Sequence, residues 1–160
     1  MTETIATDNF RKGLVAVLTE TFEKVEGIYL DRGTSLFETL ATITAEEASR
    51  PVSATCATLA AQVEHARFYL DILEQFVRGE NPGTVDWKHI WNTVTAVTPE
   101  EWEASNARLR ETYGRIVTMA TTYEGWDSED AIGGVIGMVA HTAYHLGEIR
   151  QALCTIKGTG

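Results

Sequence analysis

The feature of this sequence that most constrains its fold is a helical spacing of apolar residues in four separate stretches. In each stretch apolar side chains recur every three or four residues, which places them on one face of an α-helix. The predicted helices follow Thr7 as far as residue 29, span 53–78, run from Pro99 to just before Gly125, and run from Glu129 to about Ile156. No stretch alternates apolar and polar residues as a half-buried strand does. The sequence therefore predicts an all-α four-helix bundle whose apolar faces are buried against one another.

Capping residues mark two of the helix starts. Thr98, Pro99 and Glu101 combine an N-cap, a proline at the first helical position and a capping-box glutamate. Thr44 and Glu47 form the same kind of box in the connection after the first helix. This box predicts a short helical turn within that connection.

The connections between the predicted helices differ in length. Residues 31–52 and 79–98 are long enough to cross an end of the bundle. Trp87 and Trp91 are expected to anchor the second of these connections on the bundle, because their rings bury a large apolar area. The short turn after Gly125 predicts an antiparallel hairpin of the last two helices.

Length and charge limit the possible classes of protein. A chain of 160 residues has the usual size of one domain, so we expect residues 1–160 to form a single domain. The net charge of −10 repels nucleic acids and anionic membranes. The longest apolar run, 131–140, is far shorter than the roughly 20 residues that span a bilayer. Two cysteines are too few for a disulfide framework, and residues 1–11 lack the apolar core of a signal peptide. These features predict a cytoplasmic protein.

Three of the four histidines suggest a metal site. His141 and His145 are four residues apart, which places both imidazoles on one face of the last helix. His65 is the thirteenth residue of the second predicted helix, and His141 is the thirteenth of the last, so both lie about 18 Å along their helices. If these faces meet, three imidazoles leave coordination positions for water and substrate, as in catalytic zinc sites. The alternative is that these histidines are hydrogen-bonded structural residues, and His89 lies in a connection and is left out.

Four segments resemble the DinB/YfiT-like superfamily. The last predicted helix carries the sequence Val-Ala-His-Thr-Ala-Tyr-His-Leu-Gly-Glu-Ile-Arg-Gln at 139–151, which resembles the last-helix motif of that superfamily. Residues 35–40 and 48–51 resemble its segment before the second helix, and 63–65 resembles its first-ligand region. The resemblance covers nearly the whole chain.

The resemblance implies a metal site and a class of chemistry. The ligands of the superfamily are one histidine on the second helix and two on the last, which correspond here to His65, His141 and His145. The implied cofactor is a divalent metal, for which we expect zinc or nickel, since imidazoles bind both. Relatives include thiol-dependent S-transferases and a mycothiol-dependent maleylpyruvate isomerase. We therefore expect a small-molecule substrate, a low-molecular-weight thiol as cosubstrate, and a homodimer.

Other residues near the histidines have two interpretations each. Glu148 shares the face of His145, where it could orient an imidazole or act as a base, although a solvated carboxylate is the simpler interpretation and the superfamily often has Gln there. Glycines in the last helix cost up to about 1 kcal/mol each relative to alanine and suggest close packing or space for a substrate. These glycines are Gly133, Gly134, Gly137 and Gly147. Further candidates are Tyr69 and Tyr144 beside the site, and Arg67 and Arg150 for a substrate carboxylate. Cys56 and Cys154 are out of helical phase with the histidines and are expected to be core or boundary residues.

Three functions are compatible with these features. The first is a metal-dependent thiol S-transferase or hydrolase, in which the metal lowers the pKa of a thiol or water. The second is a non-catalytic metal- or ligand-binding bundle, linked to stress. The third is an interaction bundle that needs no histidine geometry.

Overall fold

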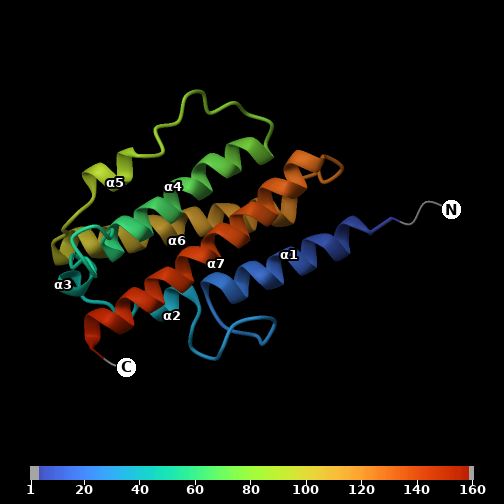
Figure 1. Ribbon diagram of the computed structural model, residues 1–160. Coiled ribbons are helices and arrows are strands. Elements are labelled where there is room, and N and C mark those ends of the chain that lie inside the picture. Colours follow the sequence, from blue (N-terminus) through green and yellow to red (C-terminus); the bar gives the residue numbers. More distant parts are fainter. Residues whose placement is uncertain (1–3, 159–160) are drawn as a thin grey trace.

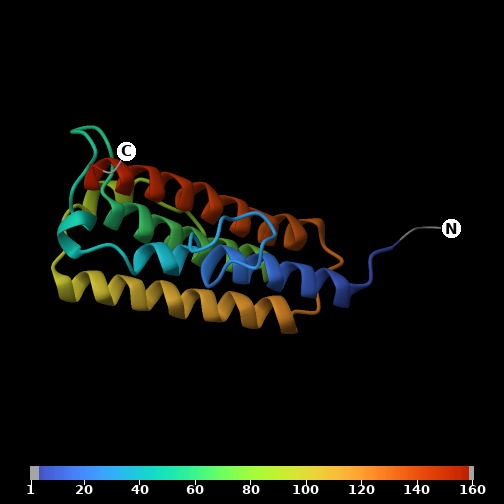
Figure 2. The same cartoon turned by 90° about the horizontal axis from the view of Figure 1, so that it is seen from below.

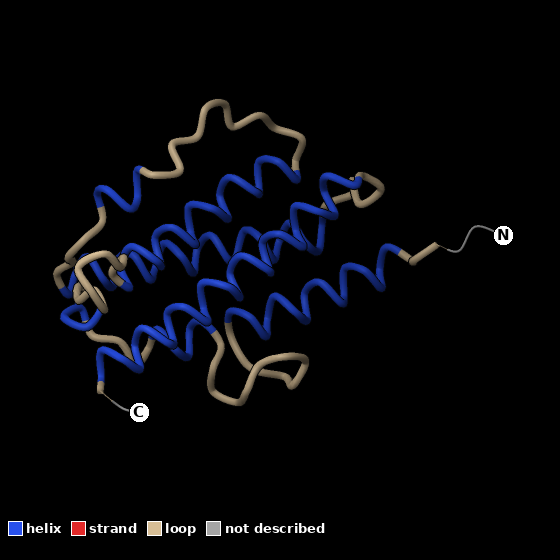
Figure 3. The backbone as a smooth tube through the Cα atoms, in the orientation of Figure 1, coloured by secondary structure: helices blue, strands red, loops and turns tan. Residues whose placement is uncertain are grey.

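The computed structural model of this protein describes residues 4–158. This part of the chain contains seven helices, joined by connections of different lengths, and no strand (Figures 1 and 3). The prediction of an all-α protein is confirmed. The helices are α1 (Thr7–Phe22), α2 (Leu36–Leu40), α3 (Ala45–Ala48), α4 (Leu59–Val77), α5 (His89–Thr93), α6 (Pro99–Thr122) and α7 (Glu129–Lys157). None of these helices combines the length and the apolar character needed to cross a membrane.

The four long helices pack side by side. α4 lies along both α6 and α7, and α1 also contacts both of them. Figure 2 shows α6 and α7 on opposite sides, with α1 and α4 filling the space between them and α2 continuing the row of α1. The predicted antiparallel course of α6 and α7 is confirmed, but the two helices lie across from each other rather than forming a packed hairpin. The core between the long helices includes Leu18, Phe22, Leu70, Leu109, Ile116, Met138, Leu146 and Ile149, each less than 2% exposed.

The first helix ends earlier than predicted. α1 stops at Phe22, and the apolar residues at 25, 28 and 29 lie in the following connection. The cause is Glu20, whose buried carboxylate accepts hydrogen bonds from the backbone N–H groups of residues 26, 28, 29 and 30. The chain turns back over this carboxylate through Gly27, whose φ of 91° suits glycine. The donors lower the pKa of Glu20 to about 2 although burial alone raises it.

The second long helix begins later than predicted. Residues 53–58 form turns, and α4 starts at Leu59, where the side chain of Thr58 accepts a hydrogen bond from the backbone N–H of Ala61. An apolar repeat marks only the face of a helix, so it did not distinguish the helix from the turn before it.

The long connections contain short helices. The predicted turn after Thr44 is confirmed as α3, whose capping box closes between Thr44 and Glu47. α2 begins with a second box, in which Glu38 accepts from the backbone N–H of Ser35. α5 was not predicted, and it places Trp91 against the histidines of α4 and α7, as predicted for an anchoring tryptophan.

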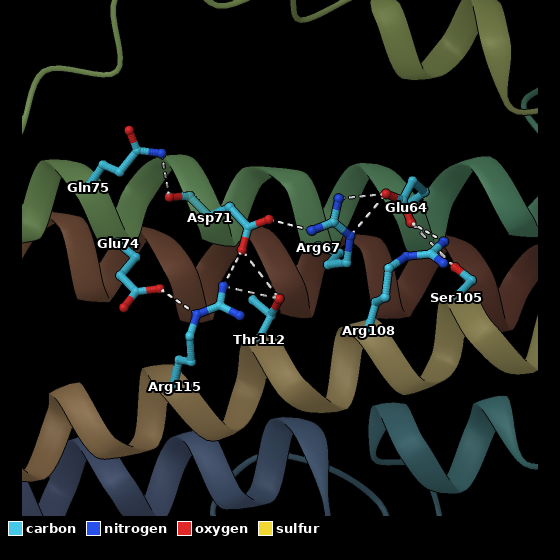
Figure 4. A network of polar contacts seen from close by, with 9 residues as sticks. All are labelled: Glu64, Arg67, Asp71, Glu74, Gln75, Ser105, Arg108, Thr112 and Arg115. Atoms are coloured by element: carbon cyan, nitrogen blue, oxygen red, sulfur yellow. Dashed lines mark hydrogen bonds and ion pairs between the residues drawn. The ribbon is translucent and has the colours of Figure 1, made fainter.

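A network of charged side chains joins α4 to α6 (Figure 4). Arg67 pairs with Glu64 and Asp71 on its own helix, and Asp71 and Glu74 pair with Arg115 of α6. The half-buried Arg67 has a pKa raised by these carboxylates against the effect of burial. Arg67 is therefore engaged in this network, which faces α6, and is not available to a substrate at the histidines.

Glycines bring α7 close to α4. A Cβ atom on Gly134 would lie 2.6 Å from a methyl of Val77, and one on Gly137 would lie 3.5 Å from Leu73. A Cβ on Gly133 or Gly147 would meet nothing within 4 Å. The close-packing interpretation thus applies to Gly134 and Gly137 but not to Gly133, whose surroundings in the described part of the chain are open.

Candidate metal centre

The three predicted ligands lie together between α4 and α7. His65 comes from α4, and His141 and His145 come from α7. One ring nitrogen of each lies within 4.8 Å of the others, an arrangement that can hold a metal ion. Among the described residues these are the only histidines, cysteines or carboxylates that form such a group. His89 is exposed at the start of α5 and takes no part in it.

Antiparallel packing of α4 on α7 brings these histidines together. Going toward the start of α4, Val77 and Leu73 face Gly134 and Gly137, and Tyr69 then stacks on His141. One turn further, His65 faces His145, their ring centroids 4.9 Å apart. His65 is the seventh residue of α4 and not the thirteenth, so the prediction of equal depth was wrong, whereas His141 is the thirteenth residue of α7. The meeting of the histidines follows from the helix register, which the glycines allow.

The outer nitrogen of His145 has two hydrogen-bond acceptors. Nδ1 lies 2.6 Å from Oε1 of Gln62 and 3.0 Å from Oε2 of Glu148. A carboxylate only accepts, so Nδ1 carries the proton and the neutral ring has its lone pair on Nε2. That lone pair points into the cluster, where Nε2 of His141 lies 3.2 Å away. Gln62 and Glu148 thereby orient His145 with its lone pair toward the other histidines.

The cluster favours uncharged imidazoles. The pKa of His65 is lowered to about 4 and that of His141 to about 3, first because burial disfavours the charged ring and second because neighbouring imidazoles repel a charge. Burial also lowers the pKa of His145, while Glu148 raises it. Neutral imidazole is the form that binds a metal, so the site needs no deprotonation near neutral pH.

Aromatic rings cover two of the histidines. The ring of Tyr69 stacks on His141 at 3.5 Å between centroids, and Trp91 of α5 lies 4.3 Å from His65. His65 and His145 are only 8% and 5% exposed, whereas His141 is half-buried. These rings shield His65 and one face of His141 from water, while His141 stays partly accessible to solvent.

The remaining candidates occupy different places. Glu148 contacts Nδ1 of His145. Of its two candidate roles, orienting an imidazole or acting as a base, this contact matches the first. Tyr144 lies beside the same ring. Arg150 lies near Thr39 of α2 instead of the cluster. Both cysteines are exposed rather than core residues, and Cys56 lies in a turn where helical phase has no meaning.

Sequence reasoning missed Gln62, although a signal for it existed. Gln62 precedes His65 by three residues, the spacing that places two side chains on one helix face. A polar side chain at that spacing from a candidate ligand is a candidate for orienting a neighbouring ligand.

The residues present fit a divalent metal. Three imidazoles are a donor set for zinc and nickel, and two of their nitrogens face each other at 3.2 Å. Among residues 4–158, no side chain or backbone group hydrogen-bonds to the buried Nδ1 atoms of His65 and His141. Comparisons with known protein families, curated proteins and solved structures find no match to this chain. The structure thus defines an all-helical protein with a three-histidine cluster.

Proposed function

We propose that this protein is a metal-dependent enzyme of the DinB/YfiT-like kind, a thiol S-transferase or hydrolase built on a four-helix bundle. The observation that carries the proposal is the convergence of His65, His141 and His145 within 4.8 Å. The resemblance of residues 139–151 and of residues 63–65 to that superfamily supports it, since the converging histidines are those that these two segments imply. A bound divalent metal, zinc or nickel, would lower the pKa of a thiol or of water and supply a nucleophile near neutral pH.

The chain's own residues prepare this site. Gln62 and Glu148 hold the proton of His145 on Nδ1 and so keep its Nε2 free for the metal. Tyr69 and Trp91 exclude water over two of the rings, which strengthens electrostatic interactions inside the site. Three protein ligands leave room for further ligands, as in catalytic sites.

The second candidate is a metal-binding bundle without catalysis. The depth of His65 and His145 favours it, because a covered site suits a metal that stabilises the fold. This candidate predicts bound metal but no turnover. A protein with metal in place that is inert toward electrophiles with bacillithiol, mycothiol and glutathione, and toward esters, would support this second function.

Elemental analysis of untagged protein tests the metal first. We expect about one zinc or nickel per chain, and a loss of most of it in His65→Ala, His141→Ala and His145→Ala variants. His89→Ala is the matched control, since His89 is exposed and outside the cluster. Wild-type protein that stays metal-free after incubation with zinc and nickel would refute both candidates.

A further inference from the structure

A surface cavity lies near His145, on the side that faces away from the other two histidines. It has a volume of about 670 Å3 and lies between α7 and the residues around the start of α4. Gln62 and Glu148, the two acceptors of the His145 proton, both line it. The imidazole of His145 therefore lies between this cavity and the cluster.

Glu148 is the only formally charged side chain that lines this cavity. No lysine or arginine among the described residues pairs with it, and its side chain is 37% exposed. Glu148 raises the pKa of the neighbouring Tyr144, first through a side-chain hydrogen bond and second through its negative charge. A carboxylate accepts about four hydrogen bonds, so Glu148 can still accept hydrogen bonds from a ligand in the cavity.

Glu148 is also free to take another partner. His145 has a second acceptor in Gln62, which lies nearer to Nδ1 than Glu148 does. If Glu148 turns to a ligand, the buried imidazole proton keeps its hydrogen bond to Gln62, and the cost of an unpaired buried donor does not arise.

The rest of the lining suits a short apolar chain. Val52 and Ala152 supply apolar surface, and Gln151 adds a neutral hydrogen-bonding group. Gly147 also lines the cavity, and a Cβ atom on it would meet nothing within 4 Å. The surface of α7 at Gly147 is therefore open to the cavity and carries no side chain of its own.

We propose that this cavity is a binding site for a small molecule with a protonated amine, whose ammonium group pairs with Glu148 and whose apolar part lies over Gly147. The site is separate from the metal site and does not require the metal. Because Glu148 serves both the ligand and His145, occupation of the cavity changes the hydrogen bonding of a metal ligand.

NMR titration of metal-free protein tests this site with three probes of equal length: propylammonium, propanol and propionate. We expect propylammonium to shift the amide signals of Gln62, Tyr144, Gly147 and Gln151, together with the Nδ1 signal of His145. We expect it to bind at least about fivefold more tightly than propanol, as an ion pair in a partly buried site allows, and propionate not to bind.

Three variants separate the cavity from general attraction to an acidic protein. Glu148→Gln should remove the preference for propylammonium, whereas Glu103→Gln should keep it, since Glu103 is exposed on α6 and lines no part of the cavity. Gly147→Leu should fold, because its side chain enters open space, and should block all probes. Equal binding of the three probes, or wild-type binding by Glu148→Gln or Gly147→Leu, would overturn the proposal. Metal content does not enter this test, so it fails or succeeds independently of the proposed enzyme.

Discussion

At the scale of single residues, the orientation of His145 depends on two neighbours. Gln62 comes from α4 and Glu148 from α7, and both accept from the same Nδ1 atom. Either acceptor alone can keep the proton there, so the two are partly redundant. This redundancy explains how Glu148 can face the cavity beside Gly147 while His145 keeps its orientation.

Removal of both acceptors should weaken metal binding more than removal of either one. We expect Gln62→Leu and Glu148→Leu each to raise the metal dissociation constant by no more than about 10-fold, and the double variant by up to about 100-fold. Isothermal titration with zinc measures the constants. Gln75→Leu is the control, because Gln75 bonds to the backbone of Asp71 on the same helix. A double variant no weaker than the single ones would contradict this account.

The sequence predicted the three histidines that cluster but not their setting. The spacing of His141 and His145, the mid-helix position of His65 and the resemblance of residues 63–65 and 139–151 indicated the three histidines. They could not show that Tyr69 stacks on His141, or that Trp91 covers His65 from a helix that was not predicted. Such contacts depend on the path of a connection, which carries no periodic signal.

At the scale of helices, the packing of α7 on α4 positions the site. Gly134 permits contact with Val77, and the same register carries His141 and His145 to their places. Any side chain at 134 must push the two helices apart or displace Val77.

Gly133 and Gly134 are neighbours on α7, and alanine substitutions at these two positions should change the stability of the protein in opposite directions. We expect Gly134→Ala to destabilise the protein by about 1–2 kcal/mol, since the clash with Val77 exceeds the gain in helix propensity. We expect Gly133→Ala to stabilise it by about 0.5–1 kcal/mol, because its new methyl meets nothing. Urea unfolding measures both. Equal effects of the two substitutions would show that α7 does not pack on α4 in this way.

Glu20 holds the connection after α1. Four backbone N–H groups donate to its carboxylate, so Glu20→Gln should lose at least half of these hydrogen bonds. We expect the amides of Ile28 and Leu30 to exchange with solvent at least about tenfold faster in this variant, as seen by hydrogen exchange. Glu26→Gln serves as control, since its side chain pairs only with the exposed Lys24. Unchanged exchange at both amides would rule out this role of Glu20.

Most helix starts with a predicted cap were placed correctly, but Thr7, predicted as the cap of the first helix, is the first residue of α1, and Ala6 takes the cap position without a side-chain hydrogen bond. The box of Thr98 and Glu101 placed the start of α6 correctly, and Ser128 caps α7 at the predicted point. The end of α1 was missed, because the carboxylate that terminates it acts through backbone groups whose partner is not visible in an apolar pattern.

At the scale of the whole molecule, the histidines couple stability to pH. In the metal-free protein the pKa values of His65 and His141 are about 4 and about 3, below the ordinary value of 6.5. Between these values and 6.5 the unfolded chain binds more protons than the folded one, so stability falls as the pH falls. Glu20 acts in a lower window, from its ordinary value of 4.5 down to about 2, where its stabilising effect is lost.

The free energy of unfolding of the metal-free protein should therefore decrease between pH 7.5 and pH 5, before Glu20 begins to titrate. We expect a loss of about 1 kcal/mol for each of His65 and His141, roughly half the value for a fully desolvated ring, because water still reaches the half-buried His141. Urea unfolding at the two pH values gives the difference. It should shrink by about half in His141→Gln and remain in His89→Gln. Stability that does not depend on pH in this window would mean that the unfolded and folded chains bind the same number of protons, and that the cluster does not hold its imidazoles neutral.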